Sequence, residues 1–176
     1  AALSAPTCST VSSLSTSSLR PLTAAGVSAK RRAELETLIL ARCIVGIGMA
    51  SVEEIDRINI LHASFLAMSR AVEMLDTKPQ HLLIDGNRFK SHLDIPFTCV
   101  IKGDGKYASI AAASILAKVY RDEMMERYAE EYPGYGWETN VGYPTVLHRQ
   151  GIMKLGLTPL HRKSFKHLPD QLDFDF

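Results

Sequence analysis

The sequence has few cysteines, no long apolar runs and, near its start, no acidic residues. Three cysteines stand among 176 residues, and none is in C-x-x-C spacing. Neither a zinc site nor a disulfide framework is therefore indicated, and a reducing, cytoplasmic compartment is expected. No apolar stretch approaches the roughly 18 to 20 residues of a membrane span, so no membrane partner is expected.

The absence of acid is sharpest in the first 28 residues, which hold eight serines, four threonines and one basic residue, Arg20; the first carboxylate is Glu34. Their apolar residues follow neither a helical nor a strand period, which predicts a poorly ordered segment. A Ser-rich, acid-free start is also typical of an organellar transit peptide. An unrelated leader, such as a stretch translated out of frame, would have the same composition. We treat 1–27 as a leader, 28–165 as one domain and 166–176 as a tail.

The middle of the chain alternates helical and strand patterns. Ser51 and Glu54 have the spacing of a capping box, in which both side chains satisfy free amides at a helix start. Helices are predicted over 29–40, 51–75 and 109–131, and strands over 43–48, 81–84 and 97–101. Beyond Pro133–Gly134, which ends the third helix, only loops and one or two short helices are expected. This alternation predicts an α/β fold.

Two glycines, Gly46 and Gly48, precede a helix and raise the alternative of a dinucleotide-binding turn. The third position of that motif is Ser51, and no acid stands about twenty residues later, where the ribose ligand is needed. The pattern therefore gives little support to a nucleotide cofactor.

Two carboxylates follow the second and third predicted strands. Asp85 closes the apolar run that begins at His81, and Asp104 follows the run that ends at Ile101. An Asp at this position can simply start a turn. Two of them at neighbouring strand ends can also be held at a fixed separation around a divalent ion, the arrangement that a metal-dependent phosphodiester hydrolase needs.

The last third of the chain is basic. Residues 133–166 contain five lysines or arginines and a single acid, Glu138, with His148 and His161 in addition. A local excess of about four charges can contact several phosphates of a nucleic acid. A solvated basic face would give the same composition.

Five motifs, in order, resemble the type 2 ribonucleases H, the bacterial ribonuclease HII family, over about Ser28 to Phe165. They are Leu83-Ile84-Asp85-Gly86-Asn87, Lys102-Gly103-Asp104, the run from Ala112 to Asp122, Gly142-Tyr143-Pro144-Thr145 and His161-Arg162-x-Ser164-Phe165, and the segment from Glu53 to Leu61 fits as well.

The resemblance implies a ribonuclease H-like mixed sheet flanked by helices. It also implies two-metal hydrolysis, with Mg²⁺ or Mn²⁺, of RNA in RNA–DNA hybrids and at ribonucleotides embedded in duplex DNA, by a monomer. By motif, Asp85 and Asp104 become the catalytic metal ligands and Tyr143 the residue that stacks near the ribose and senses its 2′-OH. Asp122 is interpreted as structural. The expected phosphate contacts, with a solvated face as the alternative for each, are Lys118, Arg121, Arg162 and Lys163.

The start of the chain departs from this family. Residues 1–27 contain neither the Asp-Glu pair nor the Gly-Arg-Gly-like turns with which the family begins. The resemblance then implies missing or altered N-terminal strands and an incomplete carboxylate set, which predicts little or no turnover. The alternative function is that of a non-catalytic remnant that at most binds nucleic acid through its basic third.

The end of the chain, Gln171 to Phe176, alternates apolar and acidic residues after Gln171. The order Gln, Leu, any residue and two large apolar residues resembles the hexapeptide by which bacterial repair proteins dock on the sliding clamp. Such a tail can lay its apolar side chains into a groove. A frayed acidic tail, or one whose aromatic residues fold back on the core, is the alternative.

Overall fold

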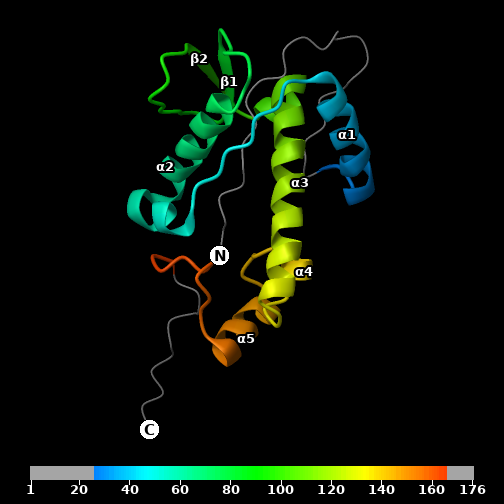
Figure 1. Ribbon diagram of the computed structural model, residues 1–176, viewed down its shortest axis with the longest axis vertical. Helices are drawn as coiled ribbons and strands as arrows, with labels where there is room; N and C mark the ends of the chain where they lie inside the picture. Colours follow the sequence, from blue (N-terminus) through cyan, green and yellow to red (C-terminus); the bar gives the residue numbers. More distant parts are fainter. Residues whose placement is uncertain (1–25, 166–176) are drawn as a thin grey trace.

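The computed structural model describes residues 26–165, in which a long central helix, α3, is flanked by a small sheet and by helices (Figure 1). The leader up to residue 25 and the tail from residue 166 lie outside the described residues. The elements, in chain order, are α1 (Ala29–Arg42), α2 (Val52–Glu73), β1 (Leu82–Asp85), β2 (Phe97–Val100), the 3-10 turn η2 (Gly103–Gly105), α3 (Ala108–Glu131), α4 (Trp137–Asn140) and α5 (Val146–Leu155).

The expected α/β alternation is confirmed in these elements. β1 and β2 pair in parallel, with Leu82 opposite Phe97 and Asp85 opposite Val100. The connection between them tucks Phe89 and Ile95 into one apolar cluster with Leu82 and Ile84 of β1 and with α2. Parallel strands end at the same edge of a sheet. The residues that follow β1 and β2 are therefore neighbours.

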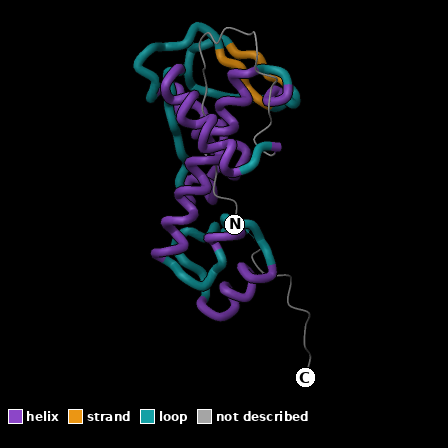
Figure 2. Tube along the Cα trace, turned by 90° about the vertical axis from the view of Figure 1, so that its right-hand side faces the viewer, coloured by secondary structure: helices purple, strands orange, loops and turns teal. Residues whose placement is uncertain are grey.

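α3 packs through alanine. Ala112, Ala113 and Leu116 of α3 are buried in one cluster with Leu35 and Ile39 of α1, and Val27 belongs to the same cluster. Small side chains let two helix backbones approach closely. At the other end of α3, Met125 packs with Tyr135, Trp137 and Ile152. The strands thus lie towards one end of the long axis and the short helices towards the other (Figure 2).

The strand expected over 43–48 is absent; the segment runs as an irregular extended chain between α1 and α2. Its glycines lie against α2 instead. A Cβ built on Gly46 would stand 2.1 Å from the Ala71 carbonyl oxygen, and one on Gly48 would stand 2.2 Å from that of Ala67. The glycines are therefore required by close backbone packing, and a dinucleotide turn does not form here.

The helix expected over 51–75 forms, with a break at Asn59. Asn59 has φ 65° and ψ 165°, which is outside the helical region. Its Oδ1 accepts hydrogen bonds from the amides of Leu61 (3.0 Å) and His62 (3.2 Å). Asn59 thus caps a second helical stretch within α2, and asparagine tolerates a positive φ better than most residues.

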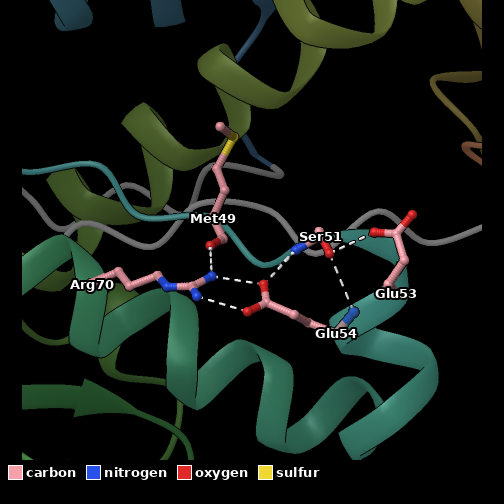
Figure 3. Close-up of polar contacts among 5 residues, drawn as sticks. All are labelled: Met49, Ser51, Glu53, Glu54 and Arg70. Carbon is pink, nitrogen blue, oxygen red and sulfur yellow. Dashed lines mark hydrogen bonds and ion pairs between the residues drawn. The ribbon is translucent and has the colours of Figure 1, made fainter.

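The capping box at the start of α2 is confirmed and extended by Arg70 (Figure 3). The Glu54 carboxylate accepts from the Ser51 amide at 2.9 Å, and the Ser51 hydroxyl accepts from the Glu54 amide at 3.2 Å. Arg70 donates to both Glu54 oxygens at 2.7 Å and to the Met49 carbonyl at 2.8 Å. The hydrogen bonds from Arg70 and from the Ser51 amide hold the pKa of Glu54 at about 2.

Glu54→Gln tests this charge, because glutamine keeps the capping geometry and loses the ion pair. The depressed pKa contributes stability above the ordinary value near 4.5, and this contribution is lost as the pH falls towards 2. We expect the variant to lose about 1 kcal/mol of unfolding free energy at pH 7, a value reduced for solvent screening, and to match the parent near pH 2. Urea titrations across this range measure it.

The control is Glu34→Gln, because the Arg31–Glu34 pair is about half exposed on both sides. That change should alter stability little at any pH. A Glu54→Gln deficit that does not depend on pH would contradict the ion-pair account.

Gly48→Ala should destabilise the protein by about 2 kcal/mol or more, because the new Cβ would meet the backbone of α2 at Ala67 and Ala71. Gly105→Ala is the matched control, since nothing lies within 4 Å of its added Cβ. Urea unfolding of both variants measures the difference. Equal stability of the two would show that the 43–48 segment does not pack on α2 as described.

Candidate active site at the strand ends and along α3

Asp85 and Asp104 lie in the two loops that leave β1 and β2. Asp85 is the last residue of β1 and is exposed, while Asp104 is half-buried in η2. The Asp85 Oδ1 accepts a hydrogen bond from the Gly103 amide at 2.8 Å, next to Asp104 in the chain. Asp104 Oδ1 accepts from the Gly105 amide at 2.9 Å. The fold therefore attaches the first carboxylate directly to the turn that carries the second.

The turn around Gly103 has a demanding backbone. Lys102, exposed, has φ 55° and ψ 47°, a left-handed conformation that costs a non-glycine residue about 1–2 kcal/mol. Gly103 is buried, and an added Cβ would stand 2.6 Å from Ile110 Cδ1 of α3. Strained backbone of this kind persists where the surroundings fix it. Here α3 and the Asp85 hydrogen bond together hold the turn.

The donor set suits a hard cation. Among residues 26–165 no group of three or more His, Cys, Asp or Glu side chains is placed to hold a metal ion. Mg²⁺, however, is usually held by one or two carboxylates together with waters and substrate phosphates. One oxygen each of Asp85 and Asp104 accepts a loop hydrogen bond, and each carboxylate has a second oxygen, the atom type that hard cations prefer. The two residues therefore fit as part of a ligand shell.

Arg121 and Tyr143 form a second group, beside α3. The Arg121 Nη2 donates to the Val141 carbonyl at 3.0 Å, and its Cζ lies 5.2 Å from the centroid of the Tyr143 ring. Tyr143 is 53% exposed and Arg121 only 8%. Arg121 stands thirteen residues after the start of α3, about 20 Å along a helix axis. The structure thus brings Asp85 to the Asp104 turn and Arg121 to Tyr143, and α3 connects the two groups.

The other expected phosphate contacts differ in accessibility. Lys118 is paired with Asp122 at 2.5 Å, and Asp122 also contacts Arg32 of α1 at 3.5 Å, which gives Asp122 the structural role expected for it. Lys163 is exposed. Arg162, by contrast, is 1% exposed, and its guanidinium carbon lies 3.7 Å from the centroid of the Phe165 ring. Burial lowers the pKa of Arg162 from its ordinary value, and this arginine is not presented to a phosphate at the surface.

The basic surface of the last third is accordingly smaller than the sequence suggests. His148 and His161 are 1% and 2% exposed and pack against Tyr135 and Trp137, with Trp137 Nε1 donating to His148 Nδ1 at 2.9 Å. Arg149 and Lys154 are exposed on α5. The histidines therefore belong to the core of this end of the molecule and not to a charged face.

Asp56 is a residue that sequence reasoning missed. Its carboxylate accepts hydrogen bonds from the amides of Lys163 (2.9 Å) and Ser164 (3.0 Å), and from the Ser164 hydroxyl. The hydroxyl bond is the largest cause of the lowered pKa of Asp56. This contact ties the start of α2 to the last described loop. No local spacing could show it, because the partners are 107 and 108 residues apart in sequence.

Comparison with known proteins identifies the family. Solved structures with this fold include the ribonuclease H2 from Pyrococcus horikoshii, with a TM-score of 0.65, 22% identity, and coverage of 82% of this chain and 76% of that one. A second is the structure of the PCNA:RNase HII complex from Archaeoglobus fulgidus, with a TM-score of 0.64, 21% identity, and coverage of 84% and 79%.

A family model described as Ribonuclease HII matches residues 26–168. The protein of that name from Parabacteroides distasonis is 58% identical over 151 residues, covering 85% of this chain and 76% of the relative. That from Christiangramia forsetii is 57% identical over 148 residues, covering 84% and 75%. The chain belongs to the ribonuclease HII family, type 2 ribonucleases H, which are endonucleases that depend on a divalent metal. The resemblance seen in the sequence motifs is thereby confirmed, whereas the roles of single residues stay predictions.

Proposed function

We propose that this chain is an endonuclease for RNA in RNA–DNA hybrids and at single ribonucleotides in duplex DNA, with Asp85 and Asp104 as carboxylate ligands of Mg²⁺ or Mn²⁺, and that its turnover is low, as expected from the incomplete carboxylate set. The observation that supports this most directly is the Asp85–Gly103 hydrogen bond, which attaches one strand-end carboxylate to the turn that carries the other. Family membership supplies the reaction class. A bound divalent ion supplies Lewis-acid stabilisation of the charge that develops on the scissile phosphate.

In this proposal the residues of the chain bind and orient the substrate. Tyr143, more than half exposed, stacks near the ribose and senses the 2′-OH that distinguishes RNA from DNA. Lys163, also exposed, contacts a backbone phosphate, and Lys118 can do so beside its partner Asp122. The chain acts as a monomer in the cytoplasm, where the substrate and a reducing environment are found. Among residues 26–165, no helix is both long and apolar enough to cross a membrane.

Asp85→Asn and Asp104→Asn test the metal assignment, because an amide keeps the shape and removes the charge that the ion needs. We expect Mn²⁺ affinity, followed by electron paramagnetic resonance, to fall at least about tenfold in each variant. Cleavage of a duplex bearing one ribonucleotide, with Mg²⁺ and with Mn²⁺, should fall about 100-fold or more relative to the parent. Asp94→Asn, an exposed aspartate in the β1–β2 connection, is the control and should change neither property.

Unchanged Mn²⁺ affinity in Asp85→Asn, or robust turnover by that variant, would overturn the assignment. A parent chain that binds the ribonucleotide duplex but cleaves it with neither metal would instead identify a non-catalytic nucleic-acid binder. Measuring metal affinity and cleavage separately distinguishes these results.

We also propose that Gln171 to Phe176 dock on a sliding clamp, which would raise the local concentration of the enzyme at newly made DNA. The segment lies outside the described residues, so the support comes from its sequence pattern and from the archaeal PCNA:RNase HII complex. A fluorescent peptide of residues 166–176 should bind a bacterial clamp at micromolar concentration, and Gln171→Ala should weaken it. Absence of binding, or binding unaffected by Gln171→Ala, would exclude the motif.

A further inference from the structure

Arg121 combines burial with contacts that a phosphate-binding arginine does not need. It lies in the second half of α3 and is 8% exposed. Its Nη2 donates to the Val141 carbonyl at 3.0 Å, and its guanidinium carbon lies 5.2 Å from the centroid of the Tyr143 ring. A phosphate would have to enter the interior to reach it. The groups that Arg121 does reach both belong to the loop that carries Tyr143.

That loop has an unusual backbone which neighbouring groups hold in place. Val141, the C-cap of α4, has φ 42° and ψ 39°, a conformation that is a true outlier for a β-branched residue. The Gly142 amide donates to Asn140 Oδ1 at 2.9 Å, and the Tyr143 amide donates to the Asn140 carbonyl at 2.8 Å. Strained residues persist only where their surroundings fix them, and the Arg121 hydrogen bond to the Val141 carbonyl is one contact that holds this loop.

Arg121 lies near a second buried arginine, Arg162. Burial is the largest cause of the lowered pKa of Arg162, and the positive charge of Arg121 acts in the same direction. An apolar side chain at position 121 would avoid burying a charge and would pack against the same neighbours. Stability alone therefore does not explain an arginine at this position. Its contacts with the Val141 carbonyl and the Tyr143 ring suggest a role in the Tyr143 loop.

We propose that Arg121 is a positioning residue, which fixes the Tyr143 ring in the orientation that reads the ribose by holding the Val141 carbonyl and one side of the ring. The inference rests on the proposed role of Tyr143 and replaces the expected phosphate contact of Arg121. It predicts that Arg121 governs the preference for ribonucleotide-containing duplex over plain DNA, whereas a phosphate contact would strengthen the binding of both alike.

The first experiment needs no nucleic acid. Hydrogen exchange of the full chain should be at least about tenfold faster in residues 141–145 of Arg121→Met than in the parent, with the exchange of 108–118 in α3 unchanged. Arg127→Met, at an exposed position on the same helix, removes the same charge and should leave residues 141–145 unchanged. Unaltered exchange of 141–145 in a folded Arg121→Met protein would overturn the positioning role.

The second experiment is a double-mutant cycle with Tyr143→Ala, read as the ratio of dissociation constants for an all-DNA duplex and the same duplex with one ribonucleotide, in Ca²⁺. Arg121→Met should lower this ratio about tenfold in the parent and leave it unchanged in Tyr143→Ala. Arg127→Met should weaken both duplexes slightly and preserve the ratio. Equal weakening of both duplexes by Arg121→Met, whether or not Tyr143 is present, would establish a phosphate contact and overturn the proposal.

Two further outcomes are distinguishable. If Arg121→Met does not fold, Arg121→Lys replaces it: a lysine keeps the charge but cannot contact the carbonyl and the ring with one planar group. The same faster exchange and lower ratio are then expected, and a lysine variant identical to the parent would refute the positioning role. If the parent shows no preference for the ribonucleotide duplex, the proposed role of Tyr143 fails, while the exchange experiment still tests whether Arg121 holds the loop.

Discussion

Close packing of the alanine-rich first half of α3 is the constraint on which the other elements depend. α1 packs against this half through Ala112 and Ala113, while Ile110 and Ala111 are buried within the same half and α3 also contacts β1 and η2. A larger side chain at these positions would separate the layers, because protein interiors leave no room for an extra methylene without strain. Ile110 in this half also meets Gly103 of η2, so the position of η2, and with it Asp104, depends on how closely α3 packs.

The strand ends show how backbone polar groups arrange a site. The Gly103 amide has a carboxylate partner, Asp85, instead of a carbonyl, and the absence of a side chain leaves room for Ile110 Cδ1 of α3. Lys102 adopts a left-handed conformation to make this turn. The left-handed conformation of Lys102 costs free energy at this turn. The charge-assisted hydrogen bond from Gly103 to Asp85 and the packing of η2 on α3 stabilise it.

The features that the sequence predicted correctly are those set by neighbouring residues. The Ser51–Glu54 capping box predicted the start of α2, the two apolar runs predicted β1 and β2, and Pro133 predicted the end of α3. The prediction of a strand over 43–48 was wrong. Gly46 and Gly48 pack against the backbone of α2, about twenty residues further along the chain.

Burial could not be predicted for the arginines either. Arg162 and Arg121 look like any basic residue in the sequence, and only the tertiary structure places them in the interior. The Lys118–Asp122 pair, by contrast, follows from its i, i+4 spacing and could have been found. The strand-end location of Asp85 and Asp104 was predicted, whereas the Asp56 link to Ser164 needed the structure.

The spacing of side chains along α3 explains why the Tyr143 loop meets Arg121. Met125, one helical turn after Arg121 and on the same face, is buried against Trp137, the first residue of α4. Because α4 is only one turn long, the chain that leaves it at Val141 is still beside that face of α3, within reach of a side chain at position 121. A shorter residue there would not reach the Val141 carbonyl, even with Met125 and Trp137 in place. The apolar contact therefore brings the loop to the helix, and the arginine then fixes the direction of Tyr143 within it.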